Sequence, residues 1–201
     1  MRVRVRARRP VVTARPGDER RGTEARADDS STPGAPVDVY RAHLYTADEL
    51  YAGLAEDGYD ATPDARAYRW SRDTGRHRDV YHSLQQALHD DAITDALDEV
   101  LDNLATVGVM GGHDLQRGSA GFATAARLGQ LLAGSGHVVL TGGGPGAMEA
   151  ANLGAYAGSE VDLAPHLARL ATVPTFEDLT AWAQVAFEVR DALDRAAEPP
   201  Q

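Results

Sequence analysis

Thr141-Gly142-Gly143-Gly144-Pro145-Gly146-Ala147-Met148-Glu149-Ala150-Ala151-Asn152 is the stretch of this chain that decides its fold. An apolar run from His137 to Leu140 leads into it, and good helix formers follow the glycines. Glycines permit unusual dihedral angles and close approach by a ligand, and the free N–H groups at a helix N-terminus attract an anion. The stretch therefore predicts a phosphate-binding turn between a strand and a helix. The alternative is a tight strand-to-helix connection that binds no ligand.

A similar unit precedes this stretch. Residues 106–110 are rich in β-branched side chains and predict a buried strand, and residues 111–119 form a first loop. Ser119 is the natural N-cap of a helix that reaches about Ala133. Two strands separated by one helix predict a βαβ unit with a parallel pair and a right-handed crossover. Both loops then lie at the carboxyl ends of the strands, where open α/β sheets bind ligands.

The residues expected to bind phosphate or nucleotide contribute backbone amides or short polar groups near the two helix starts. They are Gly111, Gly112, Arg117, Ser119, Thr141, Gly142, Gly143, Gly144, Gly146, Ala147 and Met148. Arg117 can bind a phosphate through two parallel hydrogen bonds, or it can be a solvated loop residue. For Ser119, capping the helix is favoured over donating to phosphate.

The rest of the chain predicts an α/β fold with a partial Rossmann-like domain flanked by helices. Residues 1–36 read as a disordered, arginine-rich tail, because few apolar residues are available to offset the entropy of ordering. Residues 37–201 are expected to form the nucleotide-binding domain, with its βαβ core at 106–157. Helices are expected over 47–54, over 81–104 in two pieces near Asp90-Asp91, over 162–170, and after a cap at Thr175.

Composition excludes several classes of protein. The chain has no cysteine and no lysine, since all 20 of its basic residues are arginine. Disulfides, cysteine nucleophiles, a lysine Schiff base and a Walker A lysine are therefore excluded. The histidines lack the spacing of a metal motif, so no metal and no cofactor are expected.

Charge and hydropathy bear on partners and location. The formal charge of −10 argues against a nucleic-acid binder. Residues 1–26 contain nine arginines and three acidic residues, so the remaining residues carry 11 arginines against 27 acids. No apolar run reaches the roughly 20 residues of a membrane span, and no secretory signal is evident, so a cytoplasmic location is expected.

The strand and loop motifs resemble a known family. The runs Val107-Gly-Val-Met-Gly-Gly, Ala126-Arg-Leu-Gly and Thr141-Gly-Gly-Gly-Pro-Gly-Ala-Met-Glu are similar to those of the LOG family, also labelled lysine decarboxylase-like. The resemblance covers residues 106–157. It implies a Rossmann-like fold and a nucleoside 5′-monophosphate ligand, because characterised LOG proteins are phosphoribohydrolases that release the base from such nucleotides.

The sequence departs from this family in one respect. LOG enzymes carry a second signature, Pro-Gly-Gly-x-Gly-Thr-x-x-Glu, preceded by a catalytic arginine, and neither occurs here. The chain is therefore expected to be truncated before the catalytic half. Glu149 is the remaining candidate for a catalytic acid, but the dipole favours an acid in the first turn of a helix in any case, so a capping or packing role is preferred.

Three functions stay open at this point. The first and preferred one is a nucleotide-binding fragment without hydrolase activity. The second is an active phosphoribohydrolase whose missing acid comes from elsewhere, and the third is a non-enzymatic interaction module. Since a two-stranded parallel sheet is a poor core, we expect marginal stability or a homodimer.

Overall fold

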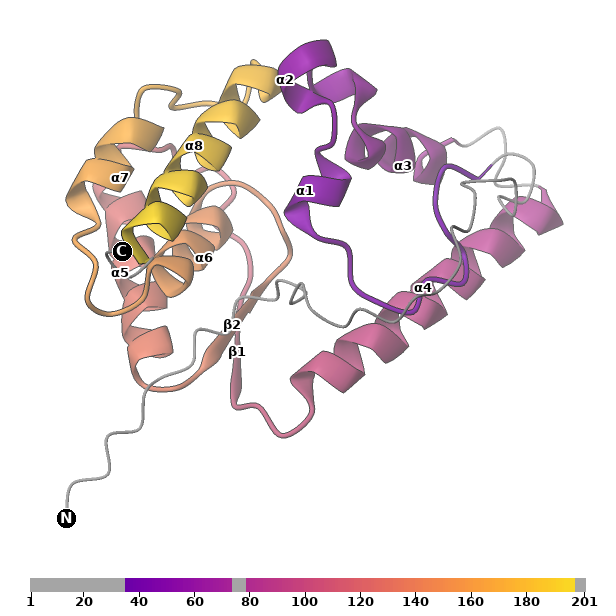
Figure 1. Cartoon of the computed structure of the whole chain (residues 1–201), viewed down its shortest axis with the longest axis horizontal. Coiled ribbons are helices and arrows are strands. Elements are labelled where there is room, and N and C mark those ends of the chain that lie inside the picture. Colours follow the sequence, from indigo (N-terminus) through magenta and orange to yellow (C-terminus); the bar gives the residue numbers. More distant parts are fainter. Residues whose placement is uncertain (1–34, 74–78, 198–201) are drawn as a thin grey trace. The chain divides into compact units, whose positions relative to one another are not determined.

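The computed structural model describes residues 35–73 and 79–197, which divide into two compact units (Figure 1). Unit 1 comprises the described residues from Asn103 onward, and unit 2 comprises those up to Asp102. The arginine-rich tail predicted for residues 1–36 lies almost entirely outside the described residues.

Unit 1 has the predicted βαβ arrangement, which confirms the α/β fold class. Strands β1 (Thr106–Val109) and β2 (Val138–Thr141) pair in parallel, with Thr106 opposite Val138 and Val109 opposite Thr141. Helix α5 (Ala120–Gly134) connects them, and α6 (Ala147–Ala157) follows β2. Ser119 caps α5 as predicted, since its hydroxyl accepts a hydrogen bond from the Phe122 amide at 3.2 Å.

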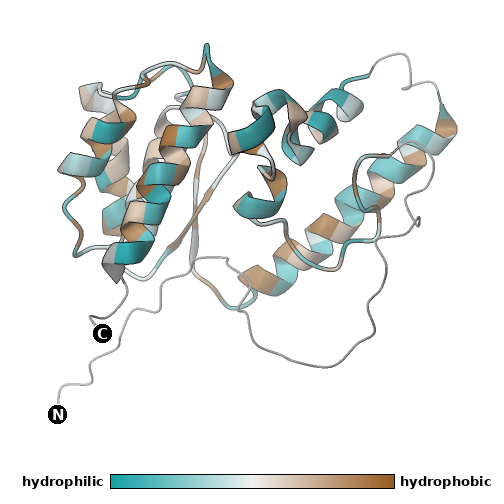
Figure 2. Ribbon diagram, turned by 45° about the horizontal axis from the view of Figure 1, so that its top comes forward, coloured by the Kyte–Doolittle hydropathy of each residue, from teal (hydrophilic) through white to brown (hydrophobic). Residues whose placement is uncertain are grey.

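Two further helices complete unit 1. They are α7 (Ala164–Leu170), which has Pro165 in its first turn as expected, and α8 (Leu179–Ala197). Brown, apolar faces of these helices are visible beside teal, polar ones (Figure 2). The core is formed by α5, α6, α8 and the ends of α7. Its buried members are Phe122, Ala126, Ala150, Ala157, Leu163, Leu170, Val185, Val189 and Leu193.

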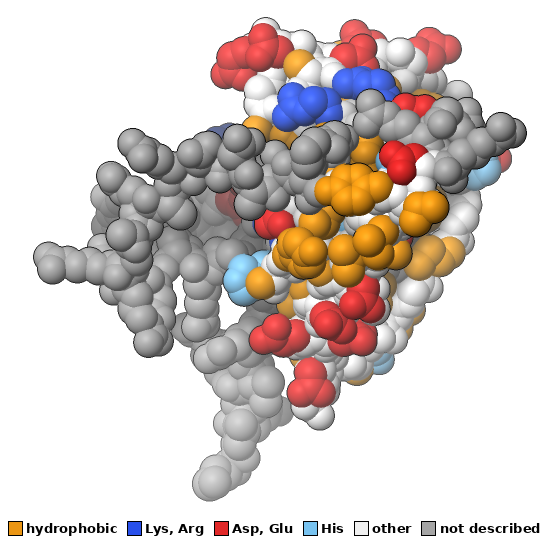
Figure 3. Space-filling model, turned by 90° about the vertical axis from the view of Figure 1, so that its right-hand side faces the viewer, with side chains coloured by type: hydrophobic (Ala, Val, Ile, Leu, Met, Phe, Trp, Pro, Cys, Tyr) orange, Lys and Arg blue, Asp and Glu red, His pale blue; other side chains and the backbone are white. Residues whose placement is uncertain are grey.

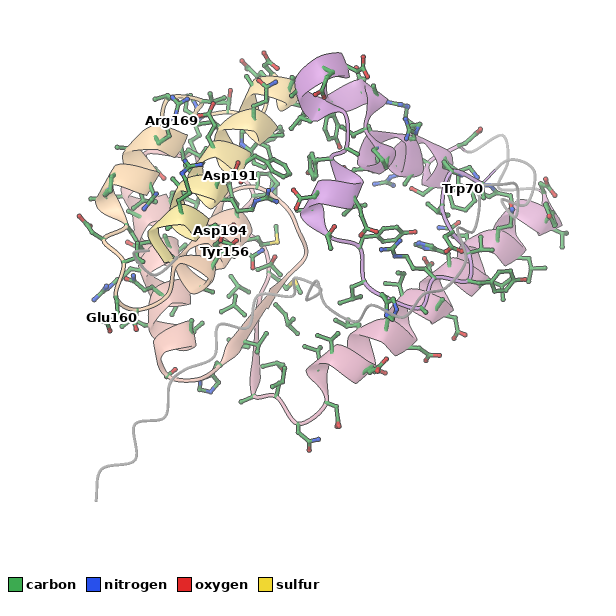
Figure 4. All side chains as sticks on the ribbon, viewed as in Figure 1. Trp70, Tyr156, Glu160, Arg169, Asp191 and Asp194 are labelled. Atoms are coloured by element: carbon green, nitrogen blue, oxygen red, sulfur yellow. The ribbon has the colours of Figure 1, made fainter. Side chains whose placement is uncertain are left out.

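Polar contacts tie α8 to the neighbouring helices. The Tyr156 hydroxyl of α6 donates a hydrogen bond of 2.6 Å to Asp194 of α8, and both residues are labelled in Figure 4. Arg169 of α7 forms an ion pair with Glu188 of α8. The prediction that Thr175 caps α8 is wrong. The Asp178 carboxylate, directly before the helix, accepts from the Ala181 amide at 3.0 Å, because this position places its oxygen over the first turn.

Helices α5 and α6 approach one another closely at two glycines. A Cβ on Gly154 would overlap the carbonyl oxygen of Ala126, and one on Gly129 would overlap the carbonyl oxygen of Ala151. Side chains are thus absent from both helices where their backbones meet. This contact fixes the spacing of the two helices whose N-termini carry the predicted ligand loops.

The sheet itself is less covered than predicted. In β1 the residues alternate between exposed and half-buried, and all four residues of β2 are half-buried. The prediction of a buried first strand is therefore wrong. Its β-branched composition does favour a strand, but burial requires elements on both faces, and the sheet has only two strands in the described part of the chain.

Unit 2 is helical. Its elements are α1 (Ala47–Leu50), α2 (Leu54–Asp57), the 3-10 turn η1 (Tyr59–Ala61), α3 (Pro63–Ser71) and α4 (Val80–Leu101). A capping box of Thr46 and Glu49 starts α1, at the residue where the helix over 47–54 was predicted to begin. The predicted single helix over 47–54 is two short helices, because Gly53 adopts a positive φ of 82°. Conversely, α4 is continuous, since Asp90 and Asp91 are solvated and do not interrupt it.

Much of the apolar surface of unit 2 is exposed. A small core contains Ala35, Val39 and Trp70. Figure 3 shows apolar side chains gathered on one face of the molecule, with acidic side chains beside them. The large exposed apolar residues of unit 2 are Tyr40, Tyr68, Val80, Tyr81, Leu84 and Val100. Several of these belong to the apolar pattern from which the helix over 81–104 was predicted.

Candidate functional site

The two predicted ligand loops contact each other at the carboxyl ends of β1 and β2. The carbonyl oxygen of Gly112 accepts hydrogen bonds from the amides of Ala147 at 3.0 Å and Leu115 at 3.3 Å. Gly112 has a φ of +66°, and a Cβ there would lie 2.7 Å from the Cβ of Ala147. Only glycine fits this position, because the backbone of the first loop lies against the start of α6.

The loop after β2 has unfilled space beside its backbone at Gly143. Gly143 has a φ of +71°, and a Cβ added there would meet no atom within 4 Å. Its amide donates to the Thr141 hydroxyl oxygen at 3.2 Å, which also accepts from the Asn152 side chain at 2.7 Å. The Thr141 hydroxyl therefore fixes the position of the loop, and the space at the Cβ position of Gly143 is open to a ligand.

Two methionines lie beside the same loop. A Cβ added to Gly142 would be 3.5 Å from the sulfur atoms of both Met110 and Met148. The chain contains three methionines, so two of them flank this glycine. Flexible thioethers give the loop an adaptable apolar border.

Arg117 is buried rather than solvated. It is 3% exposed, and its Nε donates to Oε1 of Glu149 at 2.8 Å. Its Nη1 donates to the carbonyl oxygens of Val173 at 3.4 Å and Trp182 at 3.1 Å. The guanidinium carbon also lies 4.2 Å from the centroid of the Trp182 ring. The positive charge of Arg117 is therefore already balanced by protein groups.

Burial dominates the electrostatics of this ion pair. It raises the pKa of Glu149, against the opposing effects of Arg117 and the Gly146 amide. It also lowers the pKa of Arg117, although Glu149 opposes that shift. Oε2 of Glu149 is buried and has no hydrogen-bond partner among the described residues. Burial therefore outweighs the ion pair in its effect on the pKa of Glu149, and this buried carboxyl group is costlier to ionise than a solvated one.

A cavity of about 490 Å³ opens beside the ion pair. Arg117 and Glu149 line it, together with residues of the first loop and of the segment that precedes α8. Its apolar walls are Leu115, Pro145, Pro174, Phe176 and Trp182. The volume lies within the range of small-molecule sites.

The predicted site residues lie in four places. Arg117 and Gly146 line the cavity. Gly142, Gly143 and Gly144 form the open loop beside it, between Thr141, which ends β2, and Met148, which lies in the first turn of α6. Ser119 lies in a smaller apolar depression of about 230 Å³ between α5 and α7. Gly111 and Gly112 form the turn that contacts α6, and the amide of Ala147 is occupied by Gly112.

Sequence reasoning missed the contribution of residues 173–182. Pro174, Phe176 and Trp182 line the cavity. The carbonyl oxygens of Val173 and Trp182 accept hydrogen bonds from Arg117. The one available signal was Trp182, a large residue in a chain with only two tryptophans. In the described ranges no cluster of three metal-binding side chains occurs, and no helix has the length and apolarity to cross a membrane.

The parallel strands, the crossover helix and the two loops at the carboxyl ends of the strands form a Rossmann-like α/β unit. Comparison with family models agrees with this at a coarse level, since residues 104–169 match the SLOG cluster4 family. This match covers about a third of the chain and supports a SLOG type of unit. It does not distinguish the LOG or lysine decarboxylase-like groups within that type. No curated protein and no solved structure matches the chain.

Proposed function

We propose that unit 1 binds a nucleoside 5′-monophosphate, or a related phosphorylated small molecule, without cleaving it. The observation that carries this proposal is the unfilled space beside the backbone of Gly143. This residue lies in the loop between the carboxyl end of β2 and the start of α6. Backbone amides and a helix N-terminus at this edge of a parallel sheet form a common anion site. The match of residues 104–169 to the SLOG cluster4 family supports the same conclusion.

The phosphate is assigned to the open loop rather than to the cavity. Of the arginines in the described part of the chain, only Arg117 lines the cavity, and its charge is balanced by Glu149. A phosphate placed there would compete with the buried carboxylate for the same guanidinium. At Gly143 no atom of the described residues lies within 4 Å of the Cβ position, so a ligand there meets no steric obstacle.

A matched pair of substitutions tests this assignment. Gly143→Asn and Gly143→Asp place side chains of nearly equal size in open space, and Asn and Asp are the residues that best tolerate positive φ. We expect adenosine monophosphate at 100 times its Kd to stabilise the wild type by about 2.7 kcal/mol. Gly143→Asn should keep most of this effect, whereas Gly143→Asp should abolish it by repelling the phosphate. Equal binding by the two variants, or no binding by the wild type, would refute the proposal.

The second candidate function is hydrolysis of the glycosidic bond, and one observation favours it. Glu149 lines the cavity and has a raised pKa, as a general acid requires. Against it, Oε1 of Glu149 already accepts a hydrogen bond from Arg117. Incubation of the purified protein with adenosine monophosphate separates the two functions. Release of adenine by the wild type, and its loss in Glu149→Gln, would establish the hydrolase.

A homodimer that covers the sheet remains a prediction. Both strands are only partly covered, and Leu128 and Leu131 of α5 are exposed, so a second copy would bury apolar surface. A melting temperature that rises with protein concentration would support it. A concentration-independent value would support a monomer.

A further inference from the structure

The cavity beside the ion pair has an excess of negative charge. Asp114, Glu149 and Glu177 line it, and among the described residues Arg117 is the only arginine in its walls. Glu149 neutralises Arg117, whereas Asp114 and Glu177 are exposed and form no ion pair with another described residue. An anion would therefore meet uncompensated carboxylates, and a cation would be attracted.

The walls of the cavity suit a flat apolar body. Phe176 is 50% exposed, and it lies in the lining together with Leu115 and Trp182. Aromatic faces attract cations as well as apolar groups, because their quadrupole is negative above the ring. Carboxylates and aromatic faces in one cavity are the two elements by which proteins hold organic cations.

One cation held by an aromatic ring and a carboxylate already occurs among the residues that line this cavity. The planar guanidinium of Arg117 lies over the Trp182 ring and pairs with the Glu149 carboxylate. Phe176 and Glu177 repeat the combination of aromatic ring and carboxylate at the exposed side of the cavity, without an internal cation to fill it. Asp114 adds a second carboxylate from the first loop.

We propose that this cavity binds a flat organic cation, an amidinium or guanidinium group on an apolar body, with Asp114 and Glu177 pairing with the charge and Phe176 contacting the flat face. The cavity adjoins the phosphate loop through Pro145 and Gly146, but Gly143 itself does not line it. The cavity adds to unit 1 a ligand of the opposite charge to the nucleotide phosphate.

Benzamidine and benzamide test the proposal by calorimetric titration of the full chain. The two molecules have nearly the same shape, but only benzamidine is charged at neutral pH. We expect benzamidine to bind at least about tenfold more tightly than benzamide, because a charge pair at contact distance in water provides about a fivefold change in Kd for each carboxylate. The double variant Asp114→Asn/Glu177→Gln should lose roughly 25-fold in benzamidine affinity and keep its affinity for benzamide.

Two control variants distinguish the cavity from the remaining acidic surface and from the phosphate loop. Glu160→Gln removes an exposed carboxylate of unit 1 outside the cavity and should leave both affinities unchanged. Gly143→Asp should abolish nucleotide binding without weakening benzamidine binding, because its side chain adds a negative charge and Gly143 does not line the cavity, so that loss of the nucleotide site and loss of the cation site are distinguishable. Phe176→Ala should weaken both ligands. Equal binding of benzamidine and benzamide, benzamidine binding that the double variant does not weaken, or no benzamidine binding at millimolar concentration would each overturn the proposal.

Discussion

Substitution of Gly154 by alanine tests the close contact between α5 and α6. The added Cβ would lie 2.7 Å from the carbonyl carbon of Ala126 and 2.9 Å from the amide nitrogen of Gln130, whereas ordinary contacts begin at 3.4 Å. Both neighbours are backbone atoms, so the helices must separate. Overpacking of this kind costs about 3 kcal/mol. Alanine returns about 1 kcal/mol through its higher helix propensity, which leaves a net loss of about 2 kcal/mol.

Urea denaturation and thermal melting, followed by circular dichroism, measure this loss. In a unit of this size about 2 kcal/mol corresponds to a decrease in Tm of roughly 8–16 °C. Gly121→Ala is the matched control, because Gly121 lies in α5, the other helix of this pair, and its Cβ would meet only the flexible side chain of Leu115, the nearest atom at 3.0 Å. We expect it to be neutral or slightly stabilising. A Gly154→Ala protein as stable as the control would refute the close contact.

Three further predictions concern charge and capping. Burial raises the pKa of Glu149, so the folded protein binds a proton there more tightly than the unfolded chain, which loses it above about pH 4.3. The free energy of unfolding of the wild type should therefore fall relative to that of Glu149→Gln as the pH rises. A constant difference between the two proteins in urea denaturation from pH 4 to 7 would contradict this. The hydrogen bond from Arg41 lowers the pKa of Glu49 to about 2, so Glu49→Gln should lower Tm in low salt at pH 7 and have progressively less effect as the pH falls toward about 2. Loss of the α8 cap in Asp178→Ala should cost about 1 kcal/mol in urea denaturation, and no loss would show that the cap is dispensable.

Local signals in the sequence predicted the framework of unit 1. Ser119 and the glycines after each strand are local determinants, and the predicted strands and helices agree with the structure to within about two residues. The cap of α8 was placed at Thr175 instead of Asp178, because both residues are good caps and only the path of the intervening chain decides between them.

The site required information that no local pattern contains. Arg117 and Glu149 are 32 residues apart, and Arg117 and the carbonyl oxygen of Trp182 are 65 apart. A loop arginine in the sequence is compatible with solvent, a phosphate or a buried carboxylate. Only the packing of residues 173–182 over the first loop shows that Arg117 is buried. The depth of the cavity and its excess of carboxylates follow from that same packing.

The carbonyl oxygen of Gly112 has a consequence for the motions of unit 1. It is a shared acceptor for an amide of its own loop, Leu115, and for the first amide of α6, Ala147. If the first loop moves away, both amides lose their partner in one event. Amide hydrogen exchange at the two positions is therefore coupled, and the first loop and the start of α6 open and close together.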